Sequence, residues 1–266
     1  MKLNQNNIDE LINLIIVANK AVIEIYNTDF EYTNKKDLSP LTIADLEANK
    51  IICQGLNNLN KNLDENILII SEENKNLDFN QRKKYKYCWL VDPIDGTKEF
   101  IKRNGQFTTN IGLVEYDSYN DKYFSIFGIV GIPVEETIYY GGLNYGSYKT
   151  DYHNNRKQVN IKKIKEGDTL KIVASNSHMN KETKDFIKNL NQPYDLVNYG
   201  SSIKILKVAD GSADLYPRIA PTMEWDTCAA HSIIKGAGGN LITYPEKNEL
   251  VYNKENLLNP YFQTIN

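Results

Sequence analysis

The feature that most constrains the fold is an apolar run that ends in two aspartates three residues apart. Residues 87–91 predict a buried strand, which runs directly into Asp92-Pro-Ile-Asp-Gly-Thr97. Pro93 stiffens the turn, and Gly96 can adopt a positive φ that lets backbone approach a ligand. Two carboxylates here are the hard oxygen ligands that Mg²⁺ prefers, and the N–H groups of Gly96 and Thr97 could hold a phosphate oxygen. The alternative is an ordinary β-turn before a helix.

Three further acids stand where a helix or strand begins or ends. Asp45 follows Thr42 at the start of a helix expected to reach about Leu59, Glu72 follows a strand expected over 66–71, and Asp226 opens a helix expected to end at Lys235. Taken singly, Asp45 and Asp226 are explained by helix capping and Glu72 by a solvated loop. Together with Asp92 and Asp95, however, they would repel one another without cations to neutralise them.

The order of the expected elements indicates a mixed fold in two halves. A helix over 7–26 and the helix from Thr42 precede the strands, 107–148 predicts an antiparallel meander, and the lysine-rich stretch 151–168 separates it from an α/β half. We therefore expect an N-terminal α+β half over 1–155 and a C-terminal α/β half over 156–266, which form one compact catalytic unit. The other expected elements are a loop at 27–39, a loop at 74–84, strands at 170–174, 195–198, 213–216, 241–244 and 250–252, and helices at 180–190 and 201–210.

Composition narrows the function classes. The 266 residues carry a formal net charge of −3, so no basic footprint for nucleic acid or an anionic membrane appears. The three scattered cysteines form no CxxC pair, which favours a reduced, cytoplasmic setting and argues against structural zinc. No signal peptide and no membrane span is expected. Peripheral attachment to the inner face of the membrane stays open, as does the oligomeric state, monomer or homodimer.

The set of motifs resembles the inositol monophosphatase superfamily of Mg²⁺-dependent phosphatases. Glu72-Glu73, Asp92-Pro-Ile-Asp-Gly-Thr97 and Trp225-Asp226 carry this resemblance. Within the superfamily, the flanking sequence is similar to the bacterial CysQ-type 3′(2′),5′-bisphosphate nucleotidases. The motifs for this branch are Lys98-Glu-Phe-Ile-Lys-Arg-Asn-Gly105, Gly200-Ser-Ser-Ile-Lys204 and Ala213-Asp-Leu-Tyr-Pro-Arg218.

The resemblance implies a layered αβαβα fold and a site with two or three Mg²⁺ ions. The implied metal ligands are Glu72, Asp92, the carbonyl of Ile94, Asp95 and Asp226. Asp45 and Thr97 would orient and help deprotonate the attacking water. One ion would activate this water and another would stabilise the leaving oxygen.

Substrate contacts are also implied by the resemblance. Gly96 and Thr97 would contact the scissile phosphate, with Lys98 near it. His178, Ser201 and Lys204 would contact the nucleotide, and Arg218 would meet its second phosphate.

The implied reaction is hydrolysis of adenosine 3′,5′-bisphosphate to AMP and phosphate, with 3′-phosphoadenylyl sulfate as a second substrate. The partner is thus a small nucleotide bisphosphate. Two alternatives are kept: an inositol monophosphatase or fructose-1,6-bisphosphatase, and a regulatory protein that binds nucleotide on the same scaffold without catalysis.

Overall fold

A seven-stranded sheet forms the centre of the chain in the computed structural model, which describes residues 1–35, 40–63, 65–165, 167–174 and 179–265. Its strand order is β3-β4-β5-β6-β7-β8-β9. β3 pairs with β4 in parallel, and every later pair is antiparallel. The strands are β3 (Ile67–Ser71), β4 (Tyr87–Asp95), β5 (Thr108–Asp117), β6 (Lys122–Ile132), β7 (Thr137–Gly142), β8 (Gly146–Asp151) and β9 (Lys157–Gln158). The predicted antiparallel meander is confirmed as β5 to β8.

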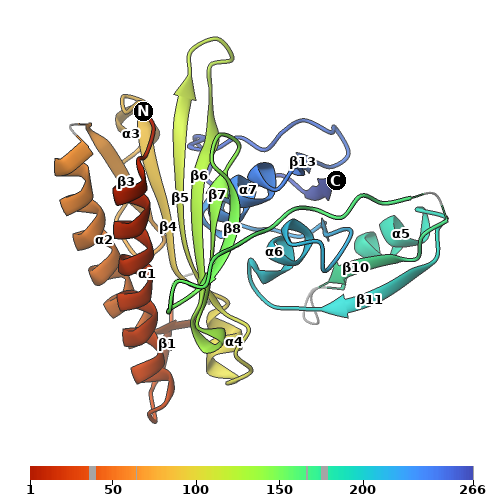
Figure 1. The fold of residues 1–266 in the computed structure, drawn as a ribbon, viewed down its shortest axis with the longest axis horizontal. Helices are drawn as coiled ribbons and strands as arrows, with labels where there is room; N and C mark the ends of the chain where they lie inside the picture. The colour runs from red at the N-terminus through yellow and green to blue at the C-terminus, as the bar shows by residue number, and fades with distance from the viewer. Residues whose placement is uncertain (36–39, 64, 166, 175–178, 266) are drawn as a thin grey trace.

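Two long helices cover one face of this sheet (Figure 1), namely α1 (Gln5–Tyr26) and α2 (Ile43–Leu63). The side chain of Asn4 caps α1 by accepting the N–H of Asn7. Leu11, Ile15 and Ala18 recur at helical spacing and are fully buried against the sheet. The helix predicted over 7–26 is therefore confirmed.

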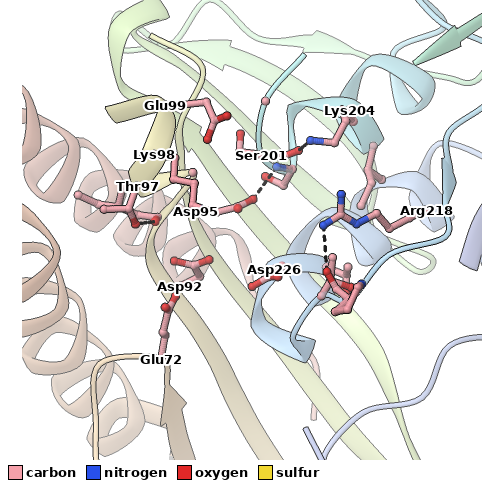
Figure 2. A pocket seen from close by; sticks show the side chains of 18 of the residues that line it. Glu72, Asp92, Asp95, Thr97, Lys98, Glu99, Ser201, Lys204, Arg218 and Asp226 are labelled. Atoms are coloured by element: carbon pink, nitrogen blue, oxygen red, sulfur yellow. Dashed lines mark hydrogen bonds between the residues drawn. The ribbon is translucent and has the colours of Figure 1, made fainter. Parts of the chain in front are cut away.

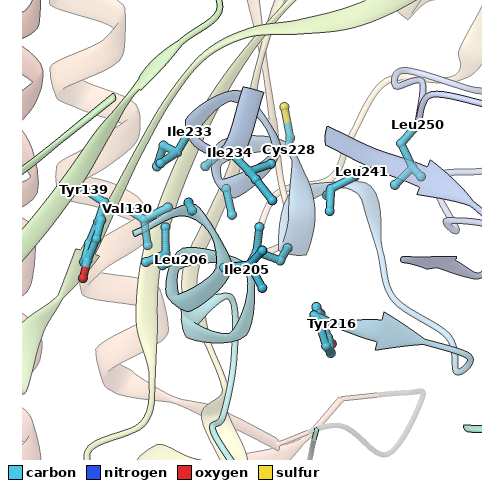
Figure 3. Close-up of a cluster of buried hydrophobic side chains, with 14 of the residues drawn as sticks. Val130, Tyr139, Ile205, Leu206, Tyr216, Cys228, Ile233, Ile234, Leu241 and Leu250 are labelled. Carbon is cyan, nitrogen blue, oxygen red and sulfur yellow. The ribbon is translucent and has the colours of Figure 1, made fainter. Parts of the chain in front are cut away.

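The opposite face packs against α6 (Ile203–Ala209) and α7 (Glu224–Gly236). Figure 3 shows Val130 and Tyr139 of the sheet facing side chains of these two helices, with no charged group among the labelled residues. Helices α6 and α7 in turn pack against small β elements, which α5 (Lys181–Lys188) covers at the far end (Figure 1). This succession of layers is the αβαβα order that the resemblance implied.

α7 lies unusually close to the sheet because two glycines face it. Gly112 of β5 pairs directly with Gly128 of β6. A Cβ on Gly128 would stand 2.0 Å from the carbonyl oxygen of Ala229, and one on Gly112 would stand 2.5 Å from Sγ of Cys228. The pair makes a flat place in the sheet on which the helix backbone rests, a few residues after Asp226.

The remaining strands form small sheets beyond α6 and α7. β10 (Leu170–Ala174) pairs in parallel with β11 (Tyr194–Asn198), and β14 (Phe262–Ile265) lies between β12 (Pro217–Arg218) and β13 (Asn240–Thr243). The structure also has a hairpin-like pair β1 (Tyr32–Asn34) and β2 (Pro40–Thr42), and the short helices α3 (Phe79–Arg82), α4 (Thr97–Ile101) and η1 (Pro133–Glu135).

Several expected elements are wrong in detail. The predicted loop 27–39 contains β1, and the predicted loop 74–84 contains α3. The strands expected at 213–216 and 250–252 are not strands: Leu215 and Tyr252 make only isolated bridges, and strand pairing begins instead at Pro217. Their apolar residues are buried because they pack into the core around α6 and α7, not because they pair with a neighbouring strand.

The boundary of the two halves stays a prediction. β9, which follows residue 155, pairs with β8 and extends the first sheet. The core between the sheet and α7 draws residues from both halves, in keeping with one compact unit. Within the described ranges, none of the helices combines the length and apolar character needed to cross a lipid bilayer.

Gly128→Ala should destabilise the protein by about 2–4 kcal/mol, because its methyl group would collide with the backbone of α7, which cannot move without disturbing the core. Urea unfolding at constant pH measures the loss. The matched control is Gly55→Ala in α2, whose new methyl meets only the movable end of Leu14 and gains helix propensity. Equal stability of the two variants would contradict this account of the α7 contact.

Candidate active site

The parallel pairing of β3 with β4 places Glu72 beside Asp92. Ser71 is in register with Val91, and the Glu72 N–H donates to the Val91 carbonyl at 3.1 Å. The next residue on each strand is therefore an acid at the same edge of the sheet. Asp92 is 2 % exposed, whereas Glu72 is half-buried.

A β-bulge turns Asp92 and Asp95 to the same side. Residues three apart on a regular strand point to opposite faces. The register of β4 against β5 shifts between these two aspartates, with Asp92 opposite Asn110 and Asp95 opposite Thr108. The hydroxyl of Thr109 donates to the Pro93 carbonyl at 3.1 Å and holds the bulge. Both carboxylates consequently line one cavity.

Gly96 ends β4 with φ at +93°, a conformation that favours glycine. A side chain at this position would also crowd the Gln106 carbonyl at 3.2 Å and Cβ of Ser201 at 3.3 Å. The chain then enters α4, where the Phe100 N–H donates to the Gly96 carbonyl. The turn is thus fixed by conformation and by close packing.

Asp45 and Thr97 meet behind this turn, although 52 residues separate them in sequence. The Thr97 hydroxyl lies 3.3 Å from Oδ1 of Asp45 and 3.2 Å from the Ile94 carbonyl. Oδ2 of Asp45 accepts the N–H and the hydroxyl of Thr42 at 2.8 and 2.6 Å, so the predicted cap is present as well. Burial raises the pKa of Asp45, while the bonds from Thr42 oppose the shift.

Asp226 reaches the same cavity from the other half of the chain. It stands in the first turn of α7, and its Oδ2 accepts the N–H of Met223 at 2.9 Å. The N-cap of α7 is Met223, so Asp226 lies three residues inside the helix rather than at the cap itself. Figure 2 shows Glu72, Asp92, Asp95 and Asp226 around one space, whose volume is about 340 Å³.

The carboxylates of the cavity repel one another, and burial strengthens the effect. Burial raises the pKa of Asp92 well above its ordinary value, and the charges of Glu72, Asp95 and Asp226 raise it further. Burial likewise raises the pKa of Asp95 to about 6, against the opposing effects of Lys204 and the Ser202 N–H. Burial also raises the pKa of Asp226, and the charge of Asp95 raises it further.

This donor set fits a hard divalent cation. All four side chains offer oxygen only, and Oδ1 of Asp92 is buried with no hydrogen-bond partner among the described residues. Within the described ranges, no three acidic, histidine or cysteine side chains stand close enough together to hold a metal ion as they are placed. Repulsion between the carboxylates accounts for part of the raised pKa values of Asp92 and Asp226.

Lys35 supplies one positive charge at the edge of this group. Its Nζ contacts Oε1 of Glu72 at 2.6 Å and Oε1 of Glu73 at 2.5 Å. Burial alone would lower the pKa of Lys35, but the two carboxylates outweigh it and raise the pKa. No signal in the sequence points to this lysine, because it stands in a polar stretch with no motif around it.

The opposite wall of the cavity is basic. Lys204 is 5 % exposed, donates to the Ser201 carbonyl at 2.7 Å and lies 5.5 Å from the ring centre of Tyr216. Burial lowers its pKa to about 8, and Asp95 opposes that effect. Arg218 donates through Nη2 to the Pro221 carbonyl at 2.9 Å. Its buried Nε and the buried hydroxyl of Ser201 have no partner in the described part of the chain.

Most of the predicted site residues therefore come together. Glu72, Asp92, Ile94, Asp95, Gly96, Thr97, Lys98, Ser201, Lys204, Arg218 and Asp226 line the cavity. Asp45 lies behind Thr97, and His178 lies outside the described residues. The cavity also contains Glu99 and Tyr216, which stand inside the quoted motifs but were not singled out.

Aromatic packing anchors the Asp92–Thr97 turn and the Lys98–Gly105 segment that follows it. Phe100 is fully buried, with ring centres of Tyr26, Phe30 and Phe107 about it at 5.1, 4.8 and 5.0 Å. Arg103 donates to the carbonyls of Tyr26 and Thr28 at the end of α1. Much of the extension that distinguishes this branch thus serves to hold α4 against α1.

Comparison with known proteins agrees with the site. The family model described as the inositol monophosphatase family matches residues 4–263. The chain is 34% identical over 258 residues to the 3′(2′),5′-bisphosphate nucleotidase CysQ of Salmonella typhimurium, covering 96% of this chain and 98% of that protein. It is 33% identical over 258 residues to the protein of the same name from Escherichia coli K12, with the same coverage.

Solved structures give the same picture. The crystal structure of CysQ from Bacteroides thetaiotaomicron superposes with a TM-score of 0.83 at 36% identity, covering 98% of this chain and 97% of that one. An IMPase of Thermotoga maritima superposes with a TM-score of 0.76 at 19% identity over 98% and 92% of the two chains, a likeness of fold alone.

The metal-free protein should become less stable as pH rises from about 4 to about 7. The pKa of Asp95 is raised to about 6 in the folded state, so folding retains a proton that the unfolded chain releases near pH 4. The loss attributable to Asp95 is on the order of 3 kcal/mol. Urea unfolding in a chelator between pH 4 and pH 7 measures it. Asp95→Asn should flatten the dependence, and an equal slope in this variant would show that other groups cause it.

Proposed function

The chain belongs to the inositol monophosphatase family, and from this membership we propose that it is a Mg²⁺-dependent 3′(2′),5′-bisphosphate nucleotidase. Its reaction is hydrolysis of the 3′-phosphate of adenosine 3′,5′-bisphosphate, which releases AMP and phosphate. 3′-Phosphoadenylyl sulfate, which carries the same 3′-phosphate, is a second substrate. The names of the full-length relatives at 33–36% identity support this assignment.

The substrate class is inferred from the division of the cavity into an acidic side and a basic side. Glu72, Asp92, Asp95 and Asp226 suit a phosphate that arrives with divalent cations. Lys204 and Arg218 on the other wall suit a second anion directly. A molecule with two separate phosphates satisfies both sides, whereas an inositol monophosphate brings no second anion for Lys204 and Arg218.

The residues proposed to hold Mg²⁺ are Glu72, Asp92, Asp95, Asp226 and the carbonyl of Ile94, with two or three ions in the site. When bound, the ions neutralise phosphate charge and make a water molecule more acidic. Asp45 and Thr97 orient the attacking water, because the carboxylate is fixed by Thr42 and holds the Thr97 hydroxyl in turn. A proton from this water passes towards Asp45 through Thr97.

The phosphate being removed lies against the Gly96–Thr97 turn in this proposal. The N–H groups there donate to its oxygens, and Lys98 adds positive charge at the open side. Ser201, Lys204 and Arg218 bind the far end of the nucleotide. The unpaired Nε of Arg218 and hydroxyl of Ser201 would gain partners from the second phosphate.

The cellular compartment proposed for the protein is inferred from the state of its cysteine thiols. All three cysteines are free, and two of them are buried. This usage fits a reducing, cytoplasmic setting.

The proposed function is tested by phosphate release with and without Mg²⁺ from adenosine 3′,5′-bisphosphate, inositol 1-phosphate and fructose 1,6-bisphosphate. We expect turnover of the nucleotide, no turnover after chelation, and a loss of at least about 1000-fold in Asp95→Asn. Glu246→Gln, which changes an exposed acid outside the cavity lining, serves as the control. Preferred turnover of inositol 1-phosphate would retain the metal site and refute the substrate. Nucleotide binding without any turnover would favour the regulatory alternative.

Arg218→Met should lower kcat/KM for adenosine 3′,5′-bisphosphate by about 10- to 100-fold, because a charge-assisted hydrogen bond to the second phosphate is lost. The same variant should change kcat/KM for adenosine 3′-monophosphate by less than about threefold, since that substrate has no second phosphate. Steady-state kinetics on the two substrates gives the comparison. Equal losses on both would place Arg218 outside the second-phosphate site.

A further inference from the structure

Glu99 is a carboxylate in the cavity that nothing in the proposed reaction yet uses. It is half-buried and lines the same space as the acids and the two cations. Among the described residues, no hydrogen bond or ion pair engages its side chain. Figure 2 shows it between Lys98 and Ser201, on the side of the cavity where Asp95 lies.

Two glycines fix where this side chain can lie. A Cβ on Gly200 would stand 2.9 Å from Cγ of Glu99, and a Cβ on Gly96 would stand 3.4 Å from its Oε2. The stem of Glu99 therefore passes over bare backbone at both positions. Because α4 is anchored through buried Phe100, the carboxylate is held at the wall of the cavity and does not lie free in solvent.

Glu99 lies between the acidic side and the basic side of the cavity. Burial sets the main pKa shifts of Asp95 and Lys204, and the Glu99 charge acts on both of them. Lys204 itself donates to the Ser201 carbonyl and, within the described part of the chain, makes no hydrogen bond to Glu99. Glu99 thus borders the region that separates the site of the scissile phosphate from the site of the second phosphate.

The chemistry of a carboxylate limits what it can contact there. Ionised Glu accepts hydrogen bonds and donates none, so it repels phosphate oxygens. In a nucleoside bisphosphate that spans the cavity, the part between the phosphates is the ribose. The ribose carries one free hydroxyl, on the carbon next to the one that bears the scissile phosphate, and this hydroxyl is a donor.

We propose that Glu99 accepts a hydrogen bond from the ribose hydroxyl beside the scissile phosphate and so selects ribonucleotides over deoxyribonucleotides. The inference rests on the proposed function and deepens it, because it names the part of the substrate that this side chain reads. Glu99 is on this view a specificity-determining residue. Its glycine neighbours let the side chain lie closely against the wall of the cavity.

The test compares adenosine 3′,5′-bisphosphate with 2′-deoxyadenosine 3′,5′-bisphosphate. The wild-type protein should prefer the ribonucleotide in kcat/KM by about 10- to 100-fold, the range for a hydrogen bond to a charged group. Glu99→Ala should reduce this preference to within about threefold, by losing activity on the ribonucleotide alone. Glu99→Gln should retain part of it, because the amide oxygen still accepts. Glu246→Gln should keep the full preference.

The outcomes separate the inference from the proposed function. Turnover of neither nucleotide by the wild-type protein would refute the function itself. Equal wild-type turnover of both would leave the function intact and refute the role of Glu99. An unchanged preference in Glu99→Ala, or an equal loss on both substrates, would show that Glu99 acts through the charge or packing of the site and would overturn the proposal.

Discussion

Repulsion among Glu72, Asp92, Asp95 and Asp226 is the constraint on which the rest of the site depends. Four carboxylates around one small space are costly in the absence of cations, as the raised pKa values of Asp92, Asp95 and Asp226 show. Each acid is held by ordinary structural devices: a parallel strand pair, a bulge and the first turn of a helix. The packing of the sheet and the helices, whose contacts lie away from the cavity, therefore offsets the repulsion between these carboxylates.

The glycine pair in the sheet shows how far such support extends. Gly112 and Gly128 have no role at the cavity, yet they let α7 settle on the sheet. That contact sets the depth at which Asp226 stands relative to the strand that carries Asp92. A carboxylate of the cavity that comes from one half of the chain is thereby positioned by bare backbone in the other half.

Much of the fold and the site could be predicted because the signals are local. The spacing of Asp92 and Asp95, the glycine after them, and the Thr42–Asp45 cap are all readable within a few residues. What failed depends on distant partners. Lys35 finds Glu72 and Glu73 only in the folded chain, and the small strand β14, between β12 and β13, has no periodicity of its own. The stretch near Tyr252 reads as a strand because burial and strand propensity look alike in a short apolar run.

The substrate class shows the same division between local and distant information. Family membership follows from the linear motifs, but the two-sided charge of the cavity emerges only when Lys204 and Arg218 face the acids across it. The facing charges are the physical reason to prefer a bisphosphate over a monophosphate.

The link between Arg103 and the end of α1 has a mechanical consequence. Arg103 holds the carbonyls of Tyr26 and Thr28, and Phe100 is locked among rings that α1 helps to supply. The first helix thus ties the glycine turn to the opposite end of the sheet, where the Leu3 N–H donates to the Tyr145 hydroxyl. A substitution that shifts the end of α1 would therefore move the backbone of α4 beside the cavity, while every carboxylate of the site stays the same.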